Sequence, residues 1–125
     1  MLLPEFLNTL LDWLSDLASE EMPDDIQVIN IGIFKSTNGY QLYLTGAKHY
    51  DPENPDWATV IDYKPKEMYL PVQDTVLNKL SWQKFLVAIE QALRIVQAHH
   101  LNDTVLSKVQ HVTFGFDDGD LHVLI

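Results

Sequence analysis

The sequence predicts an α+β domain in which an antiparallel sheet of about five to six strands packs two long helices on one face. This prediction rests on two segments with helical apolar spacing and on two hairpin signals with a Gly in the turn. No repeat, low-complexity tract or linker divides the 125 residues, so residues 1–125 are expected to form one domain. The expected order is α-β-β-β-(β)-α-β-β, where the bracket marks a short additional strand.

The first helix is expected from about residue 3 to residue 20, because apolar residues recur there every three or four positions. Pro4 suits a first helical turn, and Trp13 is placed at the edge of the apolar stripe. Acidic residues inside this segment and the lack of a basic start argue against a signal peptide. The apolar stripe consists of Leu3, Phe6, Leu7, Leu10, Leu11, Leu14, Leu17 and Ala18.

A β-hairpin is expected next, since residues 26–35 are rich in β-branched side chains, with Ile29, Ile31 and Ile33 alternating, and Asn38-Gly39 is a strong turn signal. A two-residue turn at Asn38-Gly39 would pair Ile33 with Leu44. A third strand is expected over residues 57–63, where side chains alternate between two faces.

A short edge strand is expected at residues 68–70, ended by Pro71. The second helix is predicted to begin after Ser81, a suitable N-cap, and to run to about His100. Val87 and Ile95 lie off its apolar stripe, so this helix either packs on two sides or meets a partner. A homodimer that buries Val87 and Ile95 is one such arrangement.

The C-terminus is expected to form a second hairpin over residues 112–125. With Asp118-Gly119 as the turn, Phe114 pairs with Val123 and the apolar side chains share one side of the ribbon.

The formal net charge of −10 is unevenly distributed, because residues 1–34 carry seven acidic residues and no Lys or Arg. This pattern favours either simple solubility or attraction to a basic partner. Nucleic acid is an unsuitable ligand, because its phosphates require Lys and Arg for neutralisation. The chain has no Cys and no apolar stretch long enough to span a membrane, which fits a cytoplasmic protein.

An acidic loop rich in aromatic residues and prolines runs from Tyr50 to Trp57, and no Lys or Arg occurs between Asp51 and Tyr63. Aromatic side chains commonly anchor protein interfaces, and charge at the rim accelerates association. A core position is nevertheless favoured for Trp57 and Trp82, given their size. The candidate partner-binding residues are Tyr50, Asp51, Glu53, Asp56, Trp57, Asp117, Asp118 and Asp120.

No catalytic, metal or cofactor signature accompanies these residues. The Asp117–Asp120 segment lacks the EF-hand spacing and suits a tight turn, and His99-His100 diverge on a helix rather than converge on a metal. The protein is therefore not expected to be an enzyme. The alternative kept open is a small enzyme or ligand-binding domain with a pocket between helix and sheet.

The segments TGAKHYDPENPDWATVIDYKP and FGFDDGDL resemble small, acidic bacterial proteins, some encoded beside polymorphic or secreted toxins and proposed as immunity proteins. The resemblance covers about residues 44–65 and 112–121, and Tyr50-Asp51 with Asp56-Trp57-Ala58 is its more specific part. It implies a cytoplasmic protein that covers the active surface of a toxin. Because many such toxins are basic nucleases, an acidic aromatic patch would complement one.

Overall fold

The computed structural model describes residues 4–125 and confirms the α+β class and the expected order of helices and strands. Its α-helices and β-strands are α1 (Pro4–Leu17), β1 (Val28–Ser36), β2 (Gly39–Ala47), β3 (Tyr69–Pro71), α2 (Thr75–Asn78), α3 (Trp82–His99), β4 (His111–Phe116) and β5 (His122–Val123). Three short 3₁₀ helices complete them: η1 (Pro55–Thr59), η2 (Leu101–Asp103) and η3 (Val105–Lys108).

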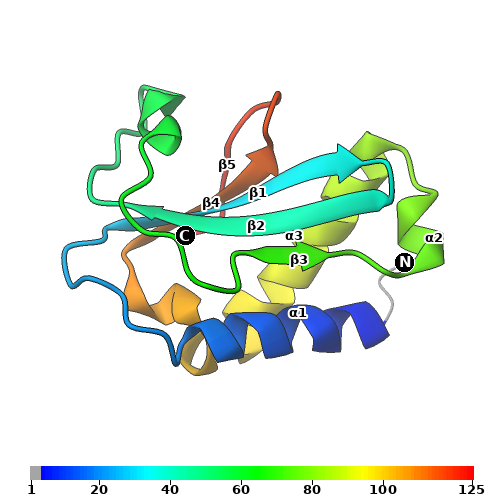
Figure 1. Cartoon of the computed structure of the whole chain (residues 1–125), viewed down its shortest axis with the longest axis horizontal. Helices are drawn as coiled ribbons and strands as arrows, with labels where there is room; N and C mark the ends of the chain where they lie inside the picture. Colours follow the sequence, from blue (N-terminus) through cyan, green and yellow to red (C-terminus); the bar gives the residue numbers. More distant parts are fainter. Residues whose placement is uncertain (1–3) are drawn as a thin grey trace.

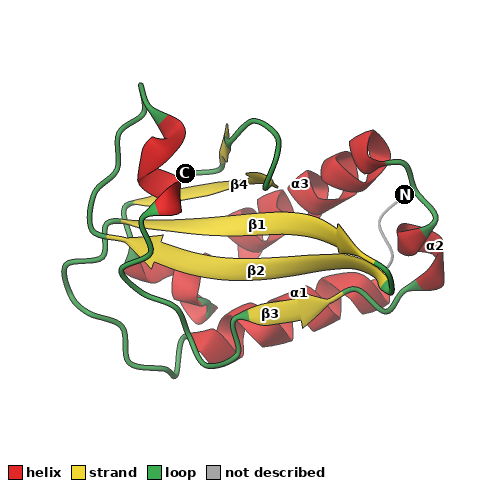
Figure 2. Cartoon of the chain, turned by 45° about the horizontal axis from the view of Figure 1, so that its top comes forward, coloured by secondary structure: helices red, strands yellow, loops and turns green. Residues whose placement is uncertain are grey.

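Within residues 4–125, five strands lie in the order β3-β2-β1-β4-β5 and are mostly antiparallel (Figure 2). The pair β1–β4 is parallel, which the two hairpin signals do not reveal. Parallel strands need a long connection between them. Here the chain passes from β3, at one edge of the sheet, through α3 to β4, which lies on the other side of β1. The sheet is therefore mixed, with β1 at its centre.

One face of the sheet is covered by α1 and α3, as expected (Figure 1). Every second side chain of β1 points toward these helices, and three of them are fully buried: Ile29, Ile31 and Ile33. They pack with Leu10 of α1 and Phe85 of α3 in one apolar core. The Ile-x-Ile-x-Ile pattern thus identified the buried face of the central strand correctly.

The first helix and the N-cap of α3 are confirmed, but the burial of two tryptophans is the reverse of what was expected. Trp13 is buried rather than at the edge, and its Nε1 donates a hydrogen bond of 2.8 Å to the carbonyl of Glu67. Trp82 is 56% exposed, so its expected place in the core is wrong. The Ser81 hydroxyl caps α3 by accepting from the Lys84 amide. Leu3 lies outside the described residues.

The first hairpin has a register two residues away from the expected one. Ser36 pairs with Gly39, and Ile33 pairs with Leu42 rather than Leu44. Gly39 opens β2 with a φ of +125°, a conformation open to glycine, and packs against Asn78 of α2. A shift of two residues keeps every side chain on its face, so the apolar pattern fits both registers equally well.

The expected third strand over residues 57–63 is wrong, and η1 and an extended loop take its place. The side chain of Asn54 accepts from the Asp56 amide, and Pro55 occupies the first turn. This local capping favours a 3₁₀ helix over the β-propensity of the residues that follow. The segment meets the sheet at Gly46, which forms a β-bridge with Tyr63 and accepts from the Asp62 amide. The edge strand expected at residues 68–70 is confirmed as β3.

The C-terminal hairpin is confirmed, but its register is shifted by one residue. Phe114 pairs with His122, not with Val123, and the connection spans residues 117–121. A shift by one residue reverses the β5 side chains relative to those of β4, so Phe114 stays buried while Val123 is 55% exposed.

Candidate functional site

Two acidic segments lie on the face of the sheet that the helices leave open. They are the loop that contains η1 and the connection between β4 and β5 over residues 117–121. In Figure 1 the green η1 segment and the red connection between β4 and β5 both stand on the side opposite α1. Between them lies a cleft of about 470 Å³, which we call the acidic cleft. It is lined by Tyr50, Asp51, Pro52, Pro55, Trp57, Thr113, Asp120, Leu121, His122 and Val123.

The first wall of the acidic cleft is a loop closed at its base and ordered by its own polar side chains. Gly46 and Tyr63 bridge its two ends. Within it, Asp51 Oδ1 accepts from the Glu53 amide at 2.9 Å, and Asp62 Oδ2 accepts from the Lys48 amide at 2.8 Å. Such an Ω-type loop has fixed geometry before any ligand arrives, which reduces the entropy lost on binding.

Aromatic contacts attach this loop to the sheet. The Tyr50 ring stacks on His111 of β4, with ring centroids 4.4 Å apart, and meets Trp57 edge to face at 5.2 Å. Trp57 is half-buried and lies outside the core, so the expectation of a core position is wrong for this residue as well. Both rings belong to the wall of the acidic cleft.

The second wall is the β4–β5 connection, to which a tyrosine on the open face of the sheet donates a hydrogen bond. The ring of Tyr43 in β2 lies over Gly32 in β1, where a Cβ atom would overlap it. Its hydroxyl donates a hydrogen bond to Asp117 Oδ1. Burial, and then Asp117, raise the pKa of Tyr43 far above its ordinary value, so the phenol stays protonated as the donor.

A glycine on the neighbouring strand also helps to position the β4–β5 connection. Gly115 of β4 is the register partner of Gly32, and a Cβ atom there would overlap the backbone carbonyl of Asp120. Two side-by-side glycines thus form a shallow floor on which Tyr43 and the Asp120 backbone lie. The sequence reasoning missed this floor. Its only signal is an isolated Gly inside each of two strand patterns.

The predicted acidic residues divide between several surfaces. Asp51 and Asp120 line the acidic cleft, whereas Glu53 and Asp56 are exposed on the loop beside it. Asp117 and Asp118 line a different cleft of about 810 Å³, which we call the Trp82 cleft. The structure therefore brings the two acidic segments together, but only Asp120 of the second segment lines the acidic cleft.

No Lys or Arg of the described residues neutralises the acidic cleft, whose lining includes the imidazole of His122. Its lining contains no Lys or Arg, and the ion pairs found within residues 4–125 lie elsewhere, between Lys48 and Asp25 and between Arg94 and Glu90. Within the same range, the Asp120 side chain makes no hydrogen bond, and Asp51 uses one oxygen for its own loop. The cleft thus presents unpaired carboxylate oxygens beside aromatic rings.

The Trp82 cleft lies at the carboxyl ends of β1 and β4, beside the start of α3. The exposed Trp82 ring meets Phe116 edge to face at 6.0 Å, and Lys35 Nζ lies 4.9 Å from the centre of the Tyr40 ring. Lys35 and the pair Asp117–Asp118 give this cleft both signs of charge.

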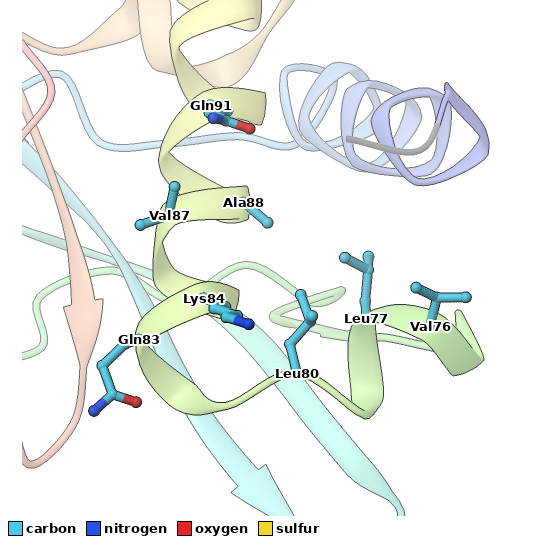
Figure 3. A pocket seen from close by; sticks show the side chains of 8 residues that line it. All are labelled: Val76, Leu77, Leu80, Gln83, Lys84, Val87, Ala88 and Gln91. Atoms are coloured by element: carbon cyan, nitrogen blue, oxygen red, sulfur yellow. The ribbon is translucent and has the colours of Figure 1, made fainter. Parts of the chain in front are cut away.

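A third hollow lies between α2 and α3, away from both acidic segments (Figure 3). It measures about 380 Å³, and Val76 and Val87 on its lining are 58% and 54% exposed. Ile95 is half-buried and lines an adjacent hollow with Arg94. The homodimer through Val87 and Ile95 stays a prediction, which sedimentation of the purified protein tests.

The part of the chain that the structure describes holds no group of three or more His, Cys, Asp or Glu placed to bind a metal ion. No helix in residues 4–125 is both long and apolar enough to cross a membrane. Comparisons with protein-family models, curated proteins and solved structures found no match to this chain.

Proposed function

We propose that this protein is an acidic binding module of the immunity type, which acts in the cytoplasm by covering a surface of a basic protein partner. One observation carries the proposal: two acidic segments far apart in the sequence flank one cleft on the open face of the sheet. These segments fall within residues 44–65 and 112–121, which carry the resemblance to immunity proteins.

The chemistry of this surface suits a protein partner. Half-buried aromatic rings supply contact area at small entropic cost, and they slow dissociation when a partner buries them. The exposed carboxylates of Glu53 and Asp56 surround them and add negative potential. In a chain with a net charge of −10, such a surface attracts basic proteins and speeds their encounter.

Copurification from the native host tests the proposal with a matched pair of triple variants. The loop variant Asp51→Asn/Glu53→Gln/Asp56→Asn removes three charges beside the acidic cleft. The amide that replaces the Asp51 carboxylate keeps an oxygen that can accept from the backbone N–H of residue 53, so the loop geometry is preserved. The control Asp12→Asn/Asp16→Asn/Asp24→Asn removes the same charge from exposed positions on and after α1.

The wild type and the control are expected to recover the same basic protein in stoichiometric amount, and the loop variant is expected to bind it at least about tenfold more weakly. The difference should shrink at high salt, because rim charges are screened. Recovery of no basic protein, or equal loss in both variants, would contradict the proposal.

A small-ligand-binding domain is the second candidate, and the Trp82 cleft favours it. Its volume of about 810 Å³ falls in the range of ligand sites, and it lies between the sheet and the start of α3. A metabolite screen read by thermal shift distinguishes the candidates. A ligand whose effect is abolished by Trp82→Ala and kept in the Asp51/Glu53/Asp56 variant would favour this second function.

A further inference from the structure

We infer that the acidic cleft receives an arginine side chain of the basic partner, with the guanidinium group between the carboxylates of Asp51 and Asp120. This inference rests on the proposed function and specifies how the partner is recognised.

The cleft suits a donor from a partner, because the ionised carboxylates of Asp51 and Asp120 can only accept hydrogen bonds. Asp51 keeps one carboxylate oxygen free of hydrogen bonds, and both oxygens of Asp120 are free within residues 4–125. No Lys or Arg of this chain lines the cleft to occupy them. An ionised carboxylate accepts two parallel hydrogen bonds from a guanidinium group but meets an ammonium only as a point charge.

The walls of the cleft favour arginine over lysine for a second reason. Tyr50, Trp57 and two prolines give the loop side an apolar and aromatic surface. A guanidinium group is planar and weakly hydrated, so it packs on such surfaces with less loss of hydration than an ammonium group. The volume of about 470 Å³ accommodates this side chain together with part of the peptide that carries it.

The cleft is also formed before binding. On the loop side, Asp51 is held by its hydrogen bond from the Glu53 amide. On the opposite side, the Asp120 carbonyl packs closely against Gly115, and Tyr43 donates a hydrogen bond to Asp117. A carboxylate held by its own loop and a turn whose backbone is already placed reduce the freedom lost when a guanidinium group enters.

The test titrates the isotope-labelled full chain with three short peptides, Gly-Gly-X-Gly-Gly, in which X is arginine, lysine or citrulline. Citrulline keeps the shape of arginine and removes its charge. The arginine peptide is expected to shift the resonances of Trp57, Thr113 and Leu121 saturably. The lysine peptide should bind more weakly, and the citrulline peptide should cause no shift there. Equal shifts from arginine and citrulline, or shifts centred on the Trp82 cleft, overturn the inference.

Two substitutions in the same turn provide the matched control. Asp120→Asn removes a charge that lines the acidic cleft, and Asp118→Asn removes one that lines the Trp82 cleft. Asp120→Asn is expected to weaken the arginine peptide about tenfold, and Asp118→Asn should leave its affinity within about twofold. Equal weakening by both variants would show a general field effect and overturn the inference.

The outcomes separate this inference from the proposed function. If the basic partner copurifies and is lost with the loop variant, yet no peptide binds in the cleft, the arginine inference fails and the proposed function stands. If the arginine peptide binds as expected but no basic protein is recovered, the cleft assignment is supported and the proposed function fails.

Discussion

The two faces of the sheet are built from opposite kinds of residue. The face under α1 and α3 is made of branched aliphatic and aromatic side chains that are almost fully buried, such as Ile31, Leu44 and Phe114. The open face carries two glycines, a tyrosine whose ring lies over one of them, Gly32, and a buried polar pair in which Thr113 donates a 2.9 Å hydrogen bond to Asn30. The covered face thus supplies stability, whereas the open face shapes the acidic cleft.

The two faces bury their inner residues by different means. On the covered face, apolar area is removed from water by the helices. On the open face, Thr113 is buried at the floor of the acidic cleft and Asn30 satisfies its hydroxyl. The rings of Phe34, Tyr43 and Tyr69 gather on the other end of this face, with centroids 6.1–6.3 Å apart.

The largest expected effect comes from truncating the covered face. Ile31→Ala should lower the free energy of unfolding by about 2–5 kcal/mol, since it removes buried methyl groups and leaves a cavity. The same change at Ile61, which is 52% exposed on the loop, should cost no more than about 0.5 kcal/mol. Urea denaturation measures both. Similar costs at the two positions would mean that the loop is as tightly packed as the core.

An intermediate effect is expected from filling the glycine floor. Gly115→Ala should destabilise by about 1–3 kcal/mol, because its Cβ overlaps the Asp120 carbonyl and the β4–β5 connection must move. Gly119→Ala is the control, since the nearest atom to its added Cβ is Phe116 Cβ at 3.5 Å. Thermal unfolding reports stability, and the amide shift of Asp120 reports displacement. An unmoved Asp120 amide in Gly115→Ala would disprove this role of the floor.

The smallest expected effect comes from Tyr43→Phe, which removes the hydroxyl that holds Asp117. At neutral pH the loss should be about 0.5–1.5 kcal/mol, the usual net value of one hydrogen bond. Tyr69→Phe removes a hydroxyl from an exposed ring of the same face and should change stability by less than about 0.5 kcal/mol. An equal loss in both variants would show that the Tyr43 hydroxyl adds nothing.

The same Tyr43→Phe variant has a pH signature with a defined sign. Because burial and Asp117 raise the pKa of Tyr43, the folded protein retains this proton at pH values where the unfolded chain releases it. The stabilisation is therefore complete below about pH 10 and is lost as the pH rises beyond it. Tyr43→Phe should lose less stability than the wild type in alkaline urea titrations. Part of the alkaline loss should remain, since burial also raises the pKa of Tyr40 and Tyr63.

The sequence predicted best where one periodicity extended over many residues. The apolar spacing of α1 and α3 and the alternation of Ile29 to Ile33 identified the buried sides correctly. It failed at residues 57–63, where Asn54 and Pro55 start η1 and override β-propensity. It also misjudged Trp13 and Trp82, because the outcome depends on which distant segment covers each ring, as the bond from Trp13 to Glu67 shows.

Local chemistry determined the class of the fold, its helices and hairpins, and the acidic character of the loop and the turn, because periodicity, caps and charge are properties of neighbouring residues. Only the tertiary structure decided that β1 and β4 run parallel and that Asp51 and Asp120 face one cleft. Those relations join residues far apart in the chain. They depend on contacts that no local pattern records, such as the glycine floor of Gly32 and Gly115.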